Sequence, residues 1–399
     1  GGIWLSTLEN GIFYLPSGNN MSFTIGGEIL NEKISAIEHV SDSVLVFATS
    51  YGTIYKFNSI NGTLDKINVN KTINTNIHSI NSLFYVESKK QLAVAFNFIN
   101  PDSLLNDRSF FLNWNGLGVV LSYSTTRFVF QDEHNILGSS FEYVYSYNTD
   151  NLLHNHLHEN FFHATSVFKD SRGRLLAGAL DGLYIFNDNH FIRFDSTNAI
   201  LNKRITDIQE LEHNYLVIAT RRDGIILYSD TSAVVINQAS GLSSDNINRI
   251  IVEPGTIWVS TNRGLNKIVI ASYNPLTYTI QLYNMSSGLP ADEINDFAIA
   301  KNNIYVATNE GLALIKEDMP GSSVQEMPLY VNAVKINDRD TAVLSSYSLD
   351  HDQNTFNIKF SAVSFKQSKN ISYLYRLAGL DTVWRSTVNR DVQFTNLPP

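Results

Sequence analysis

Three histidines at alternate positions are the first residues of this sequence whose spacing could support chemistry. His154, His156 and His158 would share one face of a β-strand, and imidazole side chains gathered there can bind zinc or copper. Asparagines lie between and beside them, which is typical of a polar loop. We favour a polar loop between structural repeats, keep a metal site at these histidines as the alternative, and predict no cofactor.

Arginine and tryptophan side chains are the candidates for binding a ligand. Arg221, Arg222 and Arg263 fall in turns between predicted strands, where a guanidinium can hold a carboxylate or an acidic sugar through two parallel hydrogen bonds. Trp114 lies in an irregular stretch and could stack on a sugar ring. The alternatives are solvated turn charges and a buried tryptophan. We predict these four residues as ligand-binding residues.

No group of residues has the spacing of a catalytic site. Asp292, Glu293 and Asp296 lie close together in the sequence, but a glycosidase pair is defined by a separation in space. The sequence has no phosphate-binding loop and no nucleophile elbow, and the absence of cysteine excludes thiolate catalysis. We therefore predict that this chain is not itself an enzyme.

The composition restricts the class of fold and of partner. The 399 residues exceed the size of an ordinary single core, roughly 250–300 residues, unless the fold is built from repeats. Hydrophobic residues make up 43% of the chain, enough for extensive burial, and no apolar run reaches the roughly 18 residues of a membrane helix. The formal net charge of −9, with no basic stripe, argues against a nucleic-acid partner.

An internal repeat organises most of the chain. An apolar strand ends in a small residue and threonine, and a short polar turn then leads to glycine and a second apolar strand. Clear copies lie about 40–50 residues apart, a period typical of propeller blades; their glycines are Gly11, Gly52, Gly182, Gly224, Gly264 and Gly311. Two degenerate copies are expected at Leu92–Ala95 and Ile136–Ser139. We predict an all-β fold, a β-propeller with seven blades favoured and eight as the alternative.

The repeat stops after Met319, and a second domain is expected there. Residues 356–360, 373–377 and 392–394 alternate apolar and polar side chains without the repeat hairpin, as in a β-sandwich. The predicted domains are a propeller over residues 1–318 and a partial, Ig-like β-sandwich over residues 319–399. Residues 1–15 either complete a blade or belong to a preceding module. Because both ends of the sequence are abrupt, we expect it to be part of a longer protein.

Two segments carry a resemblance to a known family. The segments 241–265 and 288–312, with Gly-Leu-x-x-Asp before each repeat hairpin, resemble the two-component regulator propeller repeat. Tyr373–Leu377, Trp384 and Phe394–Pro398 resemble the triple-tyrosine (Y-Y-Y) domain that follows such propellers. The resemblance implies the periplasmic sensor region of a membrane-bound sensor histidine kinase of the Bacteroidetes type. It also implies an oligosaccharide ligand and signalling through a homodimer.

Three classes of function remain open from the sequence. The first is a ligand-sensing region that binds an oligosaccharide or another small ligand and passes a signal through the sandwich domain across the membrane. The second is a propeller-fold carbohydrate-active enzyme, and the third is a protein-interaction scaffold. We favour the sensor because the propeller and triple-tyrosine resemblances follow each other in the order of that family.

Overall fold

The structure is a computed structural model. Backbone alone is described before residue 32. The described residues are 3–7, 11–15, 24–25, 28–29, 32–69, 77–100, 103–113, 118–121, 127–130, 134–139, 144–148, 150–151, 154–157, 163–195, 198–230, 232–301, 303–316, 328–350, 352–362, 373–379, 385–387 and 389–395.

The chain divides into two compact units, Asn19–Ser323 on the one hand and Gly1–Gly18 with Val324–Pro399 on the other. The boundary predicted between residues 318 and 319 stays a prediction, and the structure groups the first 18 residues with the C-terminal strands.

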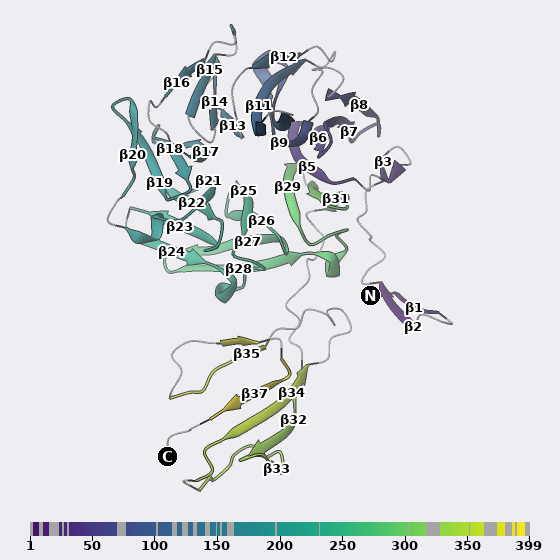
Figure 1. Ribbon diagram of the computed structural model, residues 1–399, viewed down its shortest axis with the longest axis vertical. Coiled ribbons are helices and arrows are strands. Elements are labelled where there is room, and N and C mark those ends of the chain that lie inside the picture. Colours follow the sequence, from purple (N-terminus) through teal and green to yellow (C-terminus); the bar gives the residue numbers. More distant parts are fainter. Residues whose placement is uncertain are drawn as a thin grey trace. The chain divides into compact units, whose positions relative to one another are not determined.

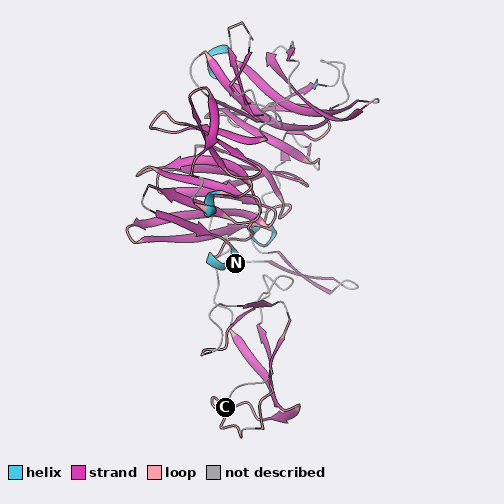
Figure 2. Ribbon diagram, turned by 60° about the vertical axis from the view of Figure 1, so that its left-hand side comes forward, coloured by secondary structure: helices cyan, strands magenta, loops and turns pink. Residues whose placement is uncertain are grey.

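The larger unit consists of antiparallel sheets arranged around a common centre (Figure 1), and strands dominate it (Figure 2). Its described residues form six four-stranded sheets and one three-stranded sheet, besides the short pair β3 (Thr24–Ile25) and β4 (Glu28–Ile29). This architecture confirms the predicted β-propeller. The preference for seven blades over eight stays a prediction.

Within each sheet the strands follow one another in chain order, and we number the sheets along the chain. Sheet 1 holds β5 (Ile34–Ser41), β6 (Val44–Thr49), β7 (Thr53–Asn58) and β8 (Leu64–Asn68); sheet 2 holds β9 (Ile77–Val86), β10 (Gln91–Asn100), β11 (Ser103–Asn113) and β12 (Gly118–Leu121); sheet 3 holds β13 (Arg127–Phe130), β14 (Asn135–Ser139), β15 (Val144–Asn148) and β16 (His154–His156). Sheet 4 holds β17 (Ala164–Lys169), β18 (Leu175–Ala179), β19 (Leu183–Asn187) and β20 (His190–Arg193); sheet 5 holds β21 (Ile205–Leu211), β22 (Tyr215–Thr220), β23 (Ile225–Ser229) and β24 (Ser232–Ile236). Sheet 6 holds β25 (Ile247–Glu253), β26 (Thr256–Thr261), β27 (Gly264–Tyr273) and β28 (Leu276–Tyr283); sheet 7 holds β29 (Ile294–Ala300), β30 (Asn303–Thr308) and β31 (Gly311–Lys316). The two degenerate repeats lie in β10 and β14, the second strands of sheets 2 and 3, as expected.

The repeat pattern has a physical cause in the hairpin between the second and third strands of a sheet. The hydroxyls of Thr220, Thr261 and Thr308 each donate to the carbonyl of the following hairpin glycine at 2.8 Å. All three threonines are fully buried, so this bond satisfies a polar group that would otherwise be costly. Threonine therefore recurs at this position, because an apolar side chain could not make this hydrogen bond.

The core lies between neighbouring sheets, because the second and third strands are buried on both faces. One cluster joins sheets 5 and 6 through Val217, Leu227, Ile250 and Val259, among others. Equivalent clusters join sheets 1 and 2, sheets 4 and 5, and sheets 6 and 7. Burial of apolar area across these junctions is the main force that assembles the ring.

The first strand of most sheets faces the centre of the ring and begins with a register shift. An extra residue there re-aims the next side chain, as a β-bulge does. The shift falls after the first residue of five such strands, between Ile34 and Ala36, Ala164 and Ser166, Ile205 and Asp207, Ile247 and Arg249, and Ile294 and Asp296. In four of these five strands the residue after the shift is polar: Ser166, Asp207, Arg249 and Asp296.

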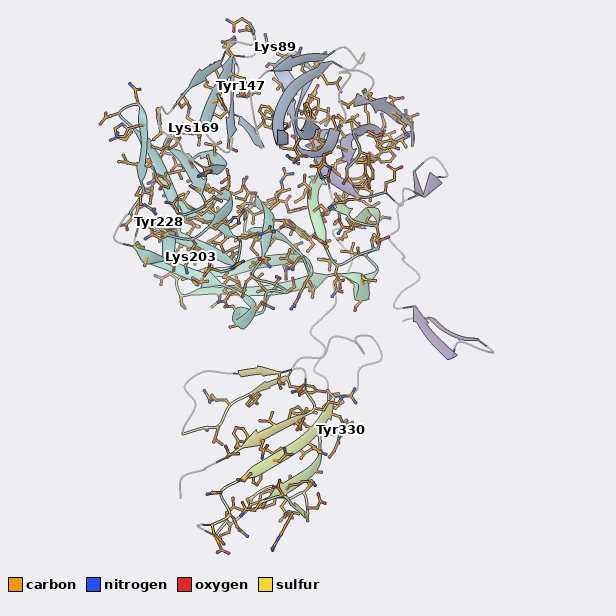
Figure 3. The ribbon with its side chains drawn as sticks, viewed as in Figure 1. Lys89, Tyr147, Lys169, Lys203, Tyr228 and Tyr330 are labelled. Carbon is orange, nitrogen blue, oxygen red and sulfur yellow. The ribbon has the colours of Figure 1, made fainter. Side chains whose placement is uncertain are left out.

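The smaller unit contains two antiparallel sheets with a core between them. One sheet is ordered β33 (Arg339–Thr341), β32 (Leu329–Ile336), β34 (Phe356–Ala362) and β37 (Asp391–Phe394), and the other pairs β35 (Tyr373–Tyr375) with β36 (Arg385–Thr387). The rings of Phe360 and Tyr373 meet edge to face at 4.7 Å, and Val392 packs beside them. β32 also carries exposed apolar side chains, including Tyr330 (Figure 3). This is the arrangement predicted for a partial β-sandwich. A separate hairpin in the same unit joins β1 (Ile3–Thr7) and β2 (Gly11–Leu15).

Candidate functional site

The inner strands of the propeller enclose a cavity of about 480 Å³. Ligand pockets typically measure ~300–1,000 Å³, so this one can hold a small molecule. Each of the seven sheets contributes to it through its first strand; the lining residues are Ser35, Glu38, Asn81, Ser82, Leu83, Phe84, Phe128, Thr165, Phe168, Lys169, Gln209, Asn248, Arg249, Asn295 and Asp296. We call it the axial cavity. Lys169, the last residue of β17, is labelled in Figure 3.

An arginine between two carboxylates is the most strongly charged feature of the axial cavity. Arg249 donates from Nη1 to Oδ1 of Asp296 at 2.6 Å, and its Nη2 lies 4.0 Å from Oε2 of Glu38. Nη1 also lies 3.4 Å from the carbonyl oxygen of Ile37. The side chains of Arg249, Glu38 and Asp296 keep 25%, 17% and 11% of their area exposed, so the cluster is accessible from the cavity. We call these three residues the charged cluster.

The surroundings keep the guanidinium charged. Burial opposes the charged form, but the nearby carboxylates of Asp296 and Glu38, the hydrogen bond that Arg249 donates to Asp296 and the more distant Asp207 outweigh it. The pKa of Arg249 is therefore raised above its ordinary value. Its Nε is buried and has no hydrogen-bond partner among the described residues.

The remaining lining suits a ligand with several hydroxyl groups. Side-chain amides of Asn81, Gln209 and Asn248 offer donors and acceptors, and Phe84 and Phe168 add partly buried apolar surface. The side-chain amide of Gln209 makes no hydrogen bond within the described residues, so it can pair with a ligand. Only four of the fifteen lining residues are apolar, so the cavity offers mainly polar and charged side chains to a ligand.

The arginines predicted as ligand-binding residues lie in the turns after the second strands of sheets 5 and 6. Arg221, Arg222 and Arg263 are all exposed. Arg221 donates from Nη1 to Oδ1 of Asn248 at 3.2 Å, so it supports a residue that lines the axial cavity. Arg222 and Arg263 are not among the lining residues.

The other predicted site residues lie outside the described residues. This holds for Trp114, for His158 and for the side chains of His154 and His156, whose backbone forms β16. In the part of the chain that the structure describes, no three His, Cys, Asp or Glu side chains are grouped so that they could hold a metal ion. None of the described helices is long and apolar enough to cross a membrane.

Sequence reasoning missed the charged cluster. Arg249 and Asp296 sit in apolar strands, Ile247–Glu253 and Ile294–Ala300, at the residue that follows the register shift. A charged residue in the middle of an apolar strand is a detectable signal, because an uncompensated charge is costly to bury. Its partner Glu38 comes from the opposite end of the propeller sequence, which no local pattern shows.

The fold and its axial cavity place this chain in the class of β-propeller proteins. No protein-family model and no curated protein matches the sequence. Among solved structures, the chain is similar over its full length to the extracellular domain of BT3049 from B. thetaiotaomicron, described as a hybrid two-component system, with a TM-score of 0.60 and 19% identity. It is also similar over its full length to the extracellular domain of BT4673 from the same organism, described as a one-component system, with a TM-score of 0.58 and 15% identity.

The chain spans 56% and 57% of the length of those two extracellular domains. A third similar structure is the WD40 β-propeller domain of Doa1, with a TM-score of 0.54 and 15% identity, where 75% of this chain covers 97% of that one. At these identities the similarity establishes the fold.

Proposed function

We propose that this chain is the extracytoplasmic ligand-sensing region of a two-component sensor histidine kinase and that it binds an oligosaccharide in the axial cavity. The observation that carries the proposal is that both units together, over the full length of the chain, resemble extracellular domains described as parts of two-component and one-component systems. The cavity supplies the second support, since its amides, hydroxyls and phenyl rings suit a sugar.

The proposed signal passes from the propeller to the sandwich-like unit and then across the membrane. The chain would occupy the periplasm as part of a membrane-anchored protein that signals as a homodimer. A ligand changes such an assembly only if it binds one arrangement of the dimer more tightly than the other. The sequence resemblance to the triple-tyrosine domain supports the relay step.

A thermal-shift titration of the full chain tests the proposed function. The probes are cellobiose, maltose, xylobiose, lactose, chondroitin disaccharide and heparin disaccharide. A ligand that binds only the folded state raises the melting temperature in a saturable way. We expect at least one probe to do so. If none of the six disaccharides raises the melting temperature, the proposal that the propeller binds an oligosaccharide is wrong.

A pair of matched variants locates the site. Gln209→Ala removes an amide that lines the axial cavity, and the binding of the active probe should weaken by roughly 5–10-fold, the value of one neutral hydrogen bond. Gln281→Ala removes the same side chain from β28, the outer strand of sheet 6, and should leave binding unchanged. Equal effects of the two variants would place the ligand elsewhere.

A further inference from the structure

The first and last sheets of the propeller meet at a junction that we call the seam. Sheet 7 ends at β31, and within the described residues no strand from elsewhere in the chain is added to it. Within the described residues the ring closes by contact between β29 and β5, without a shared sheet. The apolar part of this contact is a cluster that includes Ile37, Phe47, Ala298 and Tyr305.

Polar side chains of β29 form hydrogen bonds to the backbone of β5 across the seam. Asn295 donates from Nδ2 to the carbonyl of Ile34 at 2.8 Å, and the amide of Ile37 donates to Oδ2 of Asp296 at 3.0 Å. Asp296 is held in place by a second bond, since its Oδ1 accepts from the amide of Phe297 at 2.8 Å.

Neighbouring sheets elsewhere in the ring are joined by the same two kinds of hydrogen bond, from a backbone amide to an aspartate and from an asparagine amide to a carbonyl. The seam can therefore be compared with them. The amide of Ile250 donates to Oδ2 of Asp207 at 3.1 Å across sheets 5 and 6, and Asn248 donates to the carbonyl of Ile294 at 2.8 Å across sheets 6 and 7. The seam differs in one respect. Arg249, in the position that Asp207 has in β21, reaches past sheet 7 to the carbonyl of Ile37 in sheet 1.

The charged cluster thus belongs both to the seam and to the cavity. Arg249, Asp296 and Glu38 come from sheets 6, 7 and 1, and all three line the axial cavity. Between Nη2 of Arg249 and Oε2 of Glu38 the distance of 4.0 Å is too long for a hydrogen bond. A separation of that kind suits a bridging group. A sugar hydroxyl has the right chemistry, because it can accept from the guanidinium and donate to the carboxylate at once.

We propose that a neutral sugar unit binds in the axial cavity by bridging Arg249 and Glu38 through a hydroxyl group, and that its binding fastens the seam between sheets 1 and 7. This inference rests on the proposed function. The ligand adds a further link between β5 and β25, beside the contact of Arg249 with the carbonyl of Ile37. Because the ligand prefers the closed ring, it lowers the population of molecules in which the seam has opened.

Hydrogen exchange of the full chain, with and without cellobiose, maltose, xylobiose and lactose, tests the coupling. The probe with the largest thermal shift is used at saturation. Exchange in peptides covering residues 34–41 and 294–300 should slow by tenfold or more, because these strands carry the seam. Exchange in β18 of sheet 4, the sheet farthest from the seam in the ring order, should slow less. Equal slowing in all three peptides would show global stabilisation alone and overturn the coupling.

Substitutions of Glu38 test the bridge. Glu38→Ala removes the acceptor and should weaken binding of the same probe roughly tenfold or more, while Glu38→Gln, which keeps a hydrogen-bonding group, should weaken it less. Glu310→Ala removes an exposed carboxylate from the turn after β30 and should leave binding unchanged. Wild-type affinity in Glu38→Ala would overturn the bridge and leave the proposed function intact.

The two proposals fail in different ways. If only the chondroitin or heparin disaccharide binds, the proposal of a neutral sugar unit is wrong, whereas the proposed sensor function stands. If Glu38→Ala does not fold, Glu38→Gln tests the bridge. The hydrogen exchange of the wild-type protein tests the seam coupling without any variant. A probe that shifts the melting temperature without preferential protection of residues 34–41 overturns the seam coupling.

Discussion

Two aspartates show how the propeller satisfies backbone groups at its centre. Asp207 is 2% exposed, and its carboxylate accepts from the amide of Ile208 at 2.9 Å and from that of Ile250 in the next sheet at 3.1 Å. Asp296 repeats this arrangement with Phe297 and Ile37. These amides lie in the first strands of their sheets, which among the described residues are edge strands with no neighbouring strand on one side, and a carboxylate can accept from two donors at once.

Replacing Asp207 with alanine should destabilise the propeller by about 1–3 kcal/mol, because the amide of Ile250 loses its acceptor in a buried place. Urea unfolding of the full chain measures the change. Asp65→Ala is the control, since Asp65 is an exposed aspartate in the outer strand β8 of sheet 1. A loss of stability no larger than that of the control would mean that the bond across the sheets contributes nothing net.

At the scale of the element, the hairpin glycine is required for two reasons. Gly224 has φ +77°, and a Cβ there would lie 2.2 Å from the carbonyl oxygen of Ile236 at the end of β24. Gly264 has φ +121°, and its Cβ would lie 2.6 Å from the carbonyl oxygen of Tyr283 at the end of β28. The fourth strand of the sheet thus ends against the hairpin of the second and third strands. A side chain would push these two parts of a sheet apart.

Gly224→Ala should therefore destabilise the propeller far more than Gly62→Ala. Both positions have similar positive φ, +77° and +70°, but nothing lies within 4 Å of a Cβ at Gly62. The left-handed backbone alone costs roughly 1–2 kcal/mol with alanine, so this is the expected effect at Gly62. Thermal unfolding of both variants measures the difference. Equal losses would show that the close approach to Ile236 relaxes without cost.

The same hairpin explains how much of the fold the sequence reveals. Glycine, the preceding threonine and the apolar strands recur because each sheet needs them locally, so the period predicts the propeller. The charged cluster has no such period. Arg249 and Ile37 are 212 positions apart, and they meet only because the ring closes. Arg221 was predicted from its turn, and its contact with Asn248 depends on the next sheet.

At the scale of the whole molecule, each unit has a core of its own. The clusters of the larger unit run from sheet to sheet and return to sheet 1 through Ile37 and Tyr305, so its ring is closed within residues 19–323. The smaller unit packs Phe360, Tyr373 and Val392 between its two sheets.

A protein consisting of residues 19–323 alone should fold into the propeller. Its apolar clusters and the seam are complete without the smaller unit, and burial on that scale is the main source of stability. We expect a single cooperative thermal transition within a few degrees of the propeller transition in the full chain. Circular dichroism with melting measures this, and hydrogen exchange at residues 34–41 reports whether the seam forms. Loss of the cooperative transition, or rapid exchange at those residues, would mean that the propeller depends on the strands of the smaller unit for its closure.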